Sequence, residues 1–473
     1  MFSVNSGGIL LGILIFLYGG ATIERNRTWK DEYALWNGAV VRSPDMRRPH
    51  SNLGRAYQDR GLFHEAILEY EAALRIDPEH TITYNQLGNA CRLKGDLDRA
   101  EMAYRQALKL DPRNAKVHNN LGSLYESKEL LDQAAAEYTL ALEINPDLGE
   151  AHNNMGNIHR RRGRLDAAIG EYRKSIEIDP DIEEVRRNLG NAYLAKGLVD
   201  KAVQEYRSAL KINEDSEKAL YGLGDAYRSW GQLDRAIRAY RQALRINPDF
   251  AEAHRGLGDT YRSEGVLDSA IAEYRRVLEI DPDFDGIYSR LGTVYQTMGM
   301  LDQAIATYRQ AAEDHPDEAE LHNNLGNLYL LKGRLDQAIA EYKQALKIDP
   351  NLGGTYSNLG RSYQAAGRLD QAIAEYKRAL AVDPTLERAL YNLGQAYQAK
   401  GVTDQAIEAY RKALIAKPDY AEAYYSLARF YEEKGDYRKA VENYEHFLQH
   451  WSGHTERRDA VKARVRRLRT EVP

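Results

Sequence analysis

The side chains with the greatest capacity for binding chemistry are asparagines that recur in one register. One set lies at intervals of 34 residues or multiples of 34: Asn52, Asn120, Asn154, Asn188, Asn324, Asn358 and Asn392. A second set lies three positions further along the same register: Asn89, Asn157, Asn191 and Asn327. A side-chain amide offers both a donor and an acceptor, which is what an extended peptide backbone needs. We therefore expect a peptide-binding surface; the alternative is that these amides only cap or bridge neighbouring helices.

The asparagine series is interrupted in the middle of the chain by charged residues. Gly222, Gly256 and Arg290 occupy the register position of the first set. Several charges lie on the same expected face: Arg187, Asp225, Arg228, Arg255, Asp259, Arg262 and Arg290. This mixture predicts a central charged site that selects a charged ligand, and the alternative is a solvated face whose charges neutralise one another.

Catalytic and metal-binding patterns are missing from the sequence. It contains no Gly-x-x-x-x-Gly-Lys loop, no Gly-x-Ser-x-Gly turn and no His-Glu-x-x-His pair. Five of the 12 histidines share one register, which favours packing: His50, His118, His152, His254 and His322. His152 and His159 are close in sequence but have no third ligand. We expect no catalytic residue, no metal site, no cofactor and no enzyme activity.

Composition narrows the class of partner. The net charge is -5 on 65 basic and 70 acidic residues, so bulk charge does not favour nucleic acid as a partner. The single cysteine, Cys91, rules out an internal disulfide. It occupies a register position that holds tyrosine in most other copies, so a buried and inert thiol is expected.

These residues are positioned by a unit of 34 residues that recurs twelve times over residues 47–454. Each unit encodes two helices. The first helix ends at a glycine suited to a left-handed conformation, such as Gly61 or Gly333, although the third unit has Glu129 there. The second helix usually begins with an Asp in its first turn and ends before a proline, which cannot continue a helix.

The segments that flank the repeat array differ from a full 34-residue unit. Residues 25–46 align with the second helix of a repeat, with Trp36 at a tyrosine position. Residues 455–473 predict a basic capping helix with Ala460, Val461, Val465 and Leu468 on its packed side. A rival role for this helix is contact with anionic lipid or an acidic partner.

Residues 1–24 predict a membrane anchor. Ile9–Ile23 is an unbroken apolar run, and residues 8–23 would contact the bilayer. A cleaved signal peptide is the alternative, but no Lys or Arg precedes the run. Arg25, Arg27 and Lys30 follow it, which would place the remainder in the cytoplasm.

The pattern Leu-Gly-x-x-Tyr, Ala-x-x-x-Tyr-x-x-Ala and Pro resembles the tetratricopeptide repeat family over nearly the whole chain. The resemblance implies an all-α fold: a right-handed superhelix, or α-solenoid, of twelve helix-turn-helix repeats. Together with the two ends, this predicts an N-terminal transmembrane helix, the repeats and a C-terminal capping helix. The family geometry further implies that the first helices line a concave groove and present the asparagines to it.

Two narrower resemblances refine this expectation. The asparagine series looks like that in the tetratricopeptide arm of O-linked N-acetylglucosamine transferases, which implies peptide binding in the groove. Residues 24–54 resemble the membrane-exit junction of tetratricopeptide-containing O-mannosyltransferases, in which the repeats face away from the cytoplasm. The side of the membrane therefore stays open, and the upstream catalytic part of those enzymes is not matched here.

The sequence thus favours a membrane-anchored adaptor that binds extended protein segments in its groove. An alternative is a substrate-recruiting subunit, or detached repeat region, of a membrane glycosyltransferase system, with a polytopic glycosyltransferase as partner. A third reading is a structural protein that stacks end to end, and the charged C-terminal helix argues against it.

Overall fold

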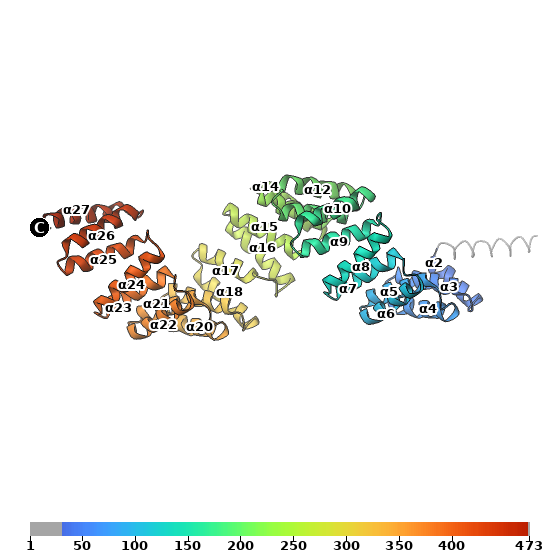
Figure 1. Ribbon diagram of the computed structural model, residues 1–473, viewed down its shortest axis with the longest axis horizontal. Coiled ribbons are helices and arrows are strands. Elements are labelled where there is room, and N and C mark those ends of the chain that lie inside the picture. The colour runs from blue at the N-terminus through green and yellow to red at the C-terminus, as the bar shows by residue number, and fades with distance from the viewer. Residues whose placement is uncertain (1–30, 472–473) are drawn as a thin grey trace, which may run out of the picture. The chain divides into compact units, whose positions relative to one another are not determined.

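The computed structural model describes residues 31–471, all of whose regular elements are helices (Figure 1). The helices are α2 (Glu32–Arg42), α3 (Arg47–Gln58), α4 (Phe63–Ile76), α5 (Thr81–Lys94), α6 (Leu97–Leu110), α7 (Ala115–Ser127), α8 (Leu131–Ile144), α9 (Gly149–Arg161), α10 (Leu165–Ile178), α11 (Glu183–Ala195), α12 (Val199–Ile212), α13 (Glu217–Ser229), α14 (Leu233–Ile246), α15 (Ala251–Glu264), α16 (Leu267–Ile280), α17 (Ile287–Thr297), α18 (Leu301–Asp314), α19 (Ala319–Leu331), α20 (Leu335–Ile348), α21 (Gly353–Ala365), α22 (Leu369–Val382), α23 (Glu387–Ala399), α24 (Thr403–Ala416), α25 (Ala421–Glu433), α26 (Tyr437–His450) and α27 (Thr455–Glu471).

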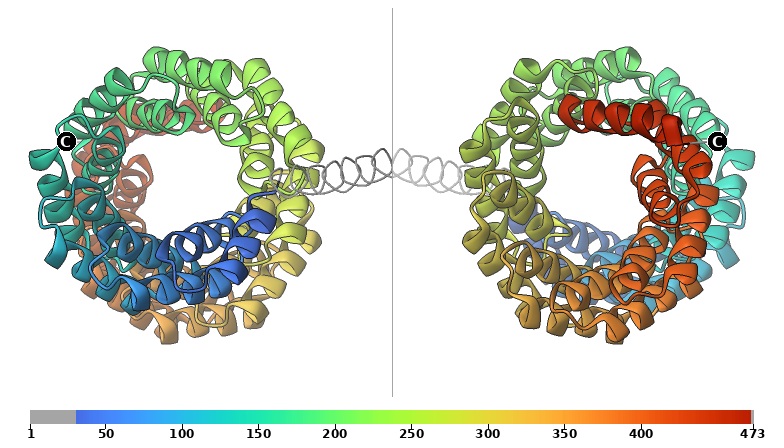
Figure 2. Two further views of the ribbon diagram at one scale, coloured as in Figure 1. Left: turned by 90° about the vertical axis from the view of Figure 1, so that its right-hand side faces the viewer. Right: turned by 90° about the vertical axis from the view of Figure 1, so that its left-hand side faces the viewer.

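The chain divides into two compact units, Met1–Ala253 and His254–Pro473. Within each unit, the two helices of a repeat pack against each other, and each repeat packs against the next. First helices also touch first helices of the following repeat, such as α3 with α5 in the first unit and α19 with α21 in the second. The first helices therefore form the inner layer of each curved unit, and the second helices form the outer layer (Figure 2).

A glycine and a tyrosine explain why the paired helices lie so close. A Cβ added to Gly326 in α19 would lie 2.7 Å from the ring of Tyr342 in α20. Tyr342 is fully buried, as are the equivalent tyrosines of most repeats. The Leu-Gly pair therefore leaves space for the aromatic ring, and these tyrosines belong to the core.

The turn between the helices of a repeat needs a left-handed residue. Gly61 and Gly333 have φ values of 73° and 69°, as expected from the sequence. Glu129 takes the same place with φ 59°, and it is the one non-glycine with positive φ among residues 31–471. Its carboxylate forms an ion pair with Arg161 of the next repeat.

The predicted end helices are present within the described range. Helix α2 packs on α3, and Trp36 in α2 is half-buried. Helix α27 packs on α26 through Val461, Val465 and Leu468. Ala460, which was expected on the packed side of α27, is exposed instead, because the buried residues of the helix recur at spacings of four and three that exclude position 460.

The predicted membrane anchor, residues 1–24, lies outside the described residues. None of the helices between residues 31 and 471 has the length and apolar character needed to cross a membrane. The right-handed course of the full twelve-repeat stack stays a prediction.

Candidate protein-binding surface

Four asparagines of the first set form hydrogen bonds between neighbouring repeats. Each donates its Nδ2 to the Oδ1 of an asparagine in the preceding first helix. The pairs are Asn120 to Asn85 (2.9 Å), Asn154 to Asn119 (3.0 Å), Asn188 to Asn153 (3.1 Å) and Asn358 to Asn327 (3.0 Å). These amides therefore bridge adjacent repeats, as expected if the asparagines bridge neighbouring helices. In each of the four, the Nδ2 group is the donor of this hydrogen bond.

The second set of asparagines accepts hydrogen bonds from the buried tyrosines. In each case a tyrosine hydroxyl donates to the Oδ1 of the asparagine. The pairs are Tyr104 to Asn89 (2.5 Å), Tyr172 to Asn157 (2.7 Å), Tyr206 to Asn191 (2.7 Å) and Tyr342 to Asn327 (2.7 Å). A buried phenol needs such a partner. Sequence reasoning missed this role, although the constant separation of 15 residues was a signal that could have revealed it.

The remaining amides of the first set keep their hydrogen-bonding capacity. Asn52, Asn324 and Asn392 are half-buried. No other side chain or backbone group among residues 31–471 forms a hydrogen bond with their amides, whose atoms remain in contact with solvent. These three positions could therefore bind a peptide backbone without breaking an existing contact.

The predicted central charges fall into both units, so they are described unit by unit. In the first unit, Asp225 accepts hydrogen bonds from the Tyr240 hydroxyl (2.6 Å) and from Arg228 (3.1 Å). Burial opposes the charge of Arg228, but hydrogen bonds with Tyr240 and Asp225 outweigh burial and raise its pKa. Arg187 lies 3.6 Å from Glu183 of its own helix. The charges of this group are therefore largely paired.

In the second unit, the predicted central site has three basic residues, Arg255, Arg262 and Arg290, and one acidic residue, Asp259. Asp259 is only 4% exposed and accepts hydrogen bonds from Tyr274 (2.7 Å) and Arg290 (2.9 Å). Arg255 lies 3.5 Å from the same carboxylate, and Arg262 is exposed. Two guanidinium groups, those of Arg255 and Arg290, therefore lie beside one buried carboxylate, and Arg262 is a third basic residue on the helix that carries Asp259.

The histidines of the common register each bind a glutamate on the second helix of their repeat. The Nδ1 to Oε2 distances are 2.6 Å for His50 and Glu69, 2.6 Å for His118 and Glu137, 2.5 Å for His152 and Glu171, 2.6 Å for His254 and Glu273, and 2.8 Å for His322 and Glu341. These contacts are internal to each repeat, which confirms the packing role. No group of three metal-binding side chains occurs in the described part of the chain.

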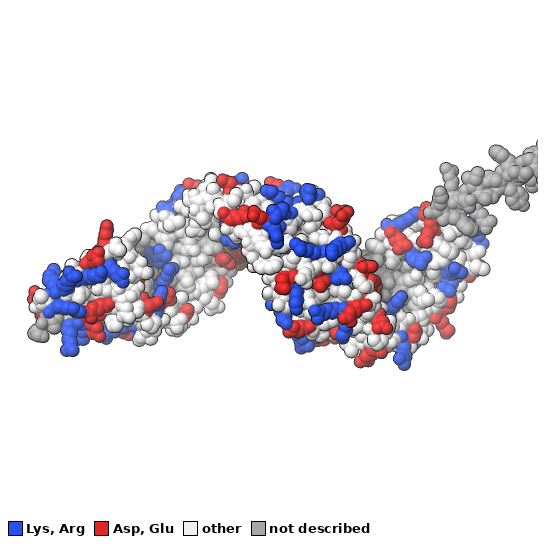
Figure 3. Space-filling view, turned by 90° about the horizontal axis from the view of Figure 1, so that it is seen from above, with Lys and Arg blue, Asp and Glu red and all other residues white. Residues whose placement is uncertain are grey.

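Charges of both signs are interspersed over the face of the protein drawn in Figure 3. Exposed Lys–Asp pairs between successive repeats contribute to this pattern, such as Lys128 with Asp98 (2.8 Å) and Lys332 with Asp302 (2.5 Å). Exposed pairs of this kind add little to stability. The charges on this face therefore do not single out a binding site.

Comparison with known proteins places the repeats in one family. Models described as "TPR repeat" or "Tetratricopeptide repeat" together match residues 48–80, 88–148 and 156–449. A curated relative, the Protein O-mannosyl-transferase Tmtc3 of Drosophila melanogaster, is 32% identical over 69 residues. That match covers 15% of this chain and only 8% of the relative, so it spans a small part of that protein's length.

Solved structures with detectable similarity include pilF of Pseudomonas aeruginosa, with TM-score 0.41, 21% identity and coverage of 46% of this chain and 97% of that one. A tetratricopeptide repeat protein of Parabacteroides merdae has a TM-score of 0.43 and 18% identity, and the match covers 52% of this chain and 98% of that one. The human IFIT1 dimer with m7Gppp-AAAA has a TM-score of 0.43 and 17% identity, and the match covers 81% of this chain and 94% of that one.

Tetratricopeptide repeats indicate a scaffold for protein–protein interaction. The matched residues include most of the chain, and the Leu-Gly and tyrosine positions are used in the structure for the same helix pairing throughout. The chain therefore belongs to the tetratricopeptide repeat family.

Proposed function

We propose that this protein is a membrane-anchored scaffold that binds extended segments of other proteins along its inner layer. The observation that carries the proposal is the set of half-buried amides without an internal partner, at Asn52, Asn324 and Asn392. Each can donate to and accept from a peptide backbone. Contacts of this kind give affinity with little dependence on side-chain sequence, because every peptide offers the same backbone groups.

The bridging amides support the same function indirectly. Hydrogen bonds such as that between Asn154 and Asn119 hold neighbouring first helices in a fixed relation before a ligand arrives. A surface that is already ordered loses less conformational entropy on binding. The amide of Asn154 also keeps its carbonyl oxygen for a ligand, since the bond to Asn119 uses only its Nδ2.

We also propose that the basic group on α15 and α17 selects acidic segments. Arg262 and Arg290 carry two positive charges, of which the buried Asp259 offsets one, and Arg262 is exposed. In the first unit, the pairing of Asp225 with Arg228 leaves a smaller imbalance. An acidic ligand would therefore gain more from the second unit than from the first.

Residues 8–23 form the proposed tether to the membrane. The charge rule favours a cytoplasmic repeat array, and the resemblance at residues 24–54 favours the opposite side. Carbonate extraction of the full chain and of residues 31–473 tests the tether. Retention of only the full chain in the membrane fraction supports it, and release of both contradicts it.

A second candidate function is recruitment of substrates to a membrane glycosyltransferase. The match to Tmtc3 favours this possibility, although it covers only 69 residues. We propose no enzyme activity for the chain itself. Co-purification with a polytopic glycosyltransferase would support the second function, and its repeated absence from crosslinked native membranes would argue against it.

A crosslinking pull-down from native membranes tests the groove. We expect the triple variant N52A/N324A/N392A to lose specific proteins that the wild type captures, with no change in melting temperature. The control N120A/N154A/N188A removes bridging amides and should lower the melting temperature instead. Equal capture by the wild type and the N52A/N324A/N392A variant would show that these amides are not the binding surface.

A further inference from the structure

A basic residue accompanies a tyrosine at nearly every junction between repeats. The tyrosine lies near the end of a first helix, and the basic residue lies 20 positions earlier, on the second helix of the preceding repeat. The pairs are Arg105 with Tyr125, Arg173 with Tyr193, Arg207 with Tyr227, Arg241 with Tyr261, Arg275 with Tyr295, Arg309 with Tyr329, Lys343 with Tyr363, Lys377 with Tyr397 and Arg411 with Tyr431. At the two exceptional junctions both residues differ: Glu71 precedes Cys91, and Thr139 precedes His159.

The paired residues contact each other in both units. Arginine donates a hydrogen bond to the tyrosine hydroxyl in four pairs: Arg105 to Tyr125 (3.0 Å), Arg207 to Tyr227 (2.7 Å), Arg309 to Tyr329 (2.9 Å) and Arg411 to Tyr431 (2.6 Å). In three more pairs the cation lies 5.9 Å from the ring centroid: Arg275 with Tyr295, Lys343 with Tyr363 and Lys377 with Tyr397. The regular junction thus contains a basic side chain from the chain itself.

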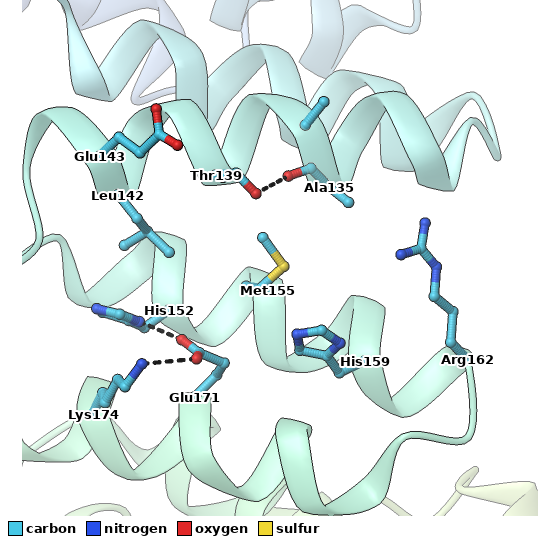
Figure 4. Close-up of a pocket in the computed structure, with 11 residues that line it drawn as sticks. Ala135, Thr139, Leu142, Glu143, His152, Met155, His159, Arg162, Glu171 and Lys174 are labelled. Carbon is cyan, nitrogen blue, oxygen red and sulfur yellow. Dashed lines mark hydrogen bonds and ion pairs between the residues drawn. The ribbon is translucent and has the colours of Figure 1, made fainter.

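The junction of Thr139 and His159 borders a cavity of about 500 Å³ on the outer side of the first unit (Figure 4). Helices α8 and α10 form its walls, and α9 lies between them. Leu142 and Met155 supply apolar surface. The Thr139 hydroxyl donates to the carbonyl oxygen of Ala135 at 2.8 Å, so it does not replace the basic side chain. The buried Nδ1 of His159 has no hydrogen-bond partner.

The charges around this cavity favour a cation. Lys174 is paired with Glu171 at 2.9 Å, and Arg162 forms an ion pair with Asp132. Glu143 is exposed on the wall formed by α8, and no cation in the described part of the chain lies within ion-pair distance of it. His159 has its pKa lowered by burial, so its ring is neutral near pH 7 and offers one acceptor nitrogen.

A regular junction in the second unit provides the comparison. There a cavity of about 440 Å³ has Lys377 and Tyr397 in the places of Thr139 and His159. Leu390 and Ala409 occupy the places of His152 and Glu171. The two cavities are similar in size, but their charges are paired differently. In the second unit, Glu408 pairs with Lys412 at 2.7 Å, and Lys377 adds a further cation. In the first unit, both basic lining residues, Arg162 and Lys174, are paired, and Glu143 has no cation partner among the described residues.

We propose that the cavity at Thr139 and His159 binds a basic side chain of a partner protein. The aliphatic part of an incoming arginine would lie against Leu142 and Met155, and its guanidinium group would meet Glu143, while His159 borders the opposite side of the cavity (Figure 4). The incoming side chain would thereby supply a positive charge beside the one junction of this unit at which Thr139 stands in place of an arginine or lysine. This site is on the outer layer and does not depend on the amides of the inner layer.

Methyl NMR tests the proposal with a side chain next to the cavity. The full chain, labelled with ¹³C at its methionine methyls, is titrated with N-acetyl-arginine amide. The Met155 signal, assigned with the M155L variant, should shift in a saturable manner, with a Kd of about 1 mM for so small a ligand. The methyls of Met46, Met102, Met298 and Met300 should not respond, and N-acetyl-glutamate amide should leave Met155 unchanged.

The variant T139R/H159Y supplies the matched control. It restores the residue pair of a regular junction, so it should fold, melt at a higher temperature than the wild type and lose the Met155 response. The variant N52A/N324A/N392A should keep the response, which separates this site from the inner surface. An equal response to the glutamate probe, a response retained by T139R/H159Y, or no saturable shift in the wild type would overturn the proposal.

Discussion

At the scale of single residues, identical side chains in one register have different roles. Asn154 bridges to the preceding repeat, Asn157 accepts a hydrogen bond from a buried tyrosine, and Asn324 has no internal partner. The periodicity predicts that these residues lie on one face, because the first helix repeats its geometry every 34 residues. It does not predict which amide is used internally, because that depends on the neighbour one repeat away.

The glycine of the Leu-Gly pair gives a direct test of the packing. Gly326→Ala would place a Cβ 2.7 Å from a ring carbon of Tyr342, and overpacking of this kind costs about 1–3 kcal/mol. We expect a lower melting temperature by calorimetry. Gly354→Ala is the matched control, since a Cβ there would meet no atom within 4 Å. An equal effect of the two substitutions would contradict the role assigned to Gly326.

The single cysteine gives a second test. Cys91 is completely buried, and burial raises the pKa of its thiol to about 11. Because the thiolate is the reactive form, alkylation by iodoacetamide at pH 8 should be slow in the native protein. Unfolding in guanidinium chloride should restore rapid alkylation. Rapid labelling of the native protein at pH 8 would show that the thiol is accessible.

At the scale of helices, the ends of the array use different contacts. Helix α27 is held on α25 by Glu432, which accepts hydrogen bonds from Arg464 (2.6 Å) and Arg467 (3.0 Å). Arg457 lies 4.5 Å from the ring centroid of Tyr425. Several of its basic residues are thus engaged in capping, whereas Arg466 is exposed and forms no ion pair among the described residues. The lipid-binding role of this helix stays a prediction.

The contact at Glu432 makes the docking of α27 sensitive to acid. Burial opposes ionisation of Glu432, but hydrogen bonds from Arg464 and Tyr444 outweigh it and lower the pKa. The stabilisation is therefore complete above the ordinary glutamate pKa of about 4.3 and is lost as the pH falls through the lower folded-state value. Trp451, beside Phe447 and Arg457, reports on this end of the chain.

We expect acid titration below pH 5 to change the fluorescence of Trp451 in a chain whose other tryptophans are phenylalanine. Glu432→Gln should remove most of this change and loosen α27 already at pH 7. Glu445→Gln, which removes only an exposed partner of Arg469, should leave the titration largely unchanged. Identical titrations for wild type and Glu432→Gln would contradict the assigned role.

At the scale of the whole molecule, the sequence predicted the repeats and the ends of their helices to within a few residues. It could do so because each repeat packs only on its neighbours, so the local pattern determines the local fold. The division at Ala253 and His254 was not predicted, since the 34-residue period continues through it without a change. The pairing of basic residues with the junction tyrosines was also not predicted, because it joins residues of two different repeats.

Site-specific photocrosslinking tests the central claim, binding of extended segments to the inner layer, most directly. A photoreactive phenylalanine analogue replaces Leu331 in α19 or Ile415 in α24, which are 61% and 81% exposed and tolerate replacement for that reason. We predict discrete crosslinked partners in native membranes from position 331, their loss in the N52A/N324A/N392A background, and none from position 415. Equal crosslinking from both positions, or no effect of the asparagine substitutions, would contradict the proposed groove.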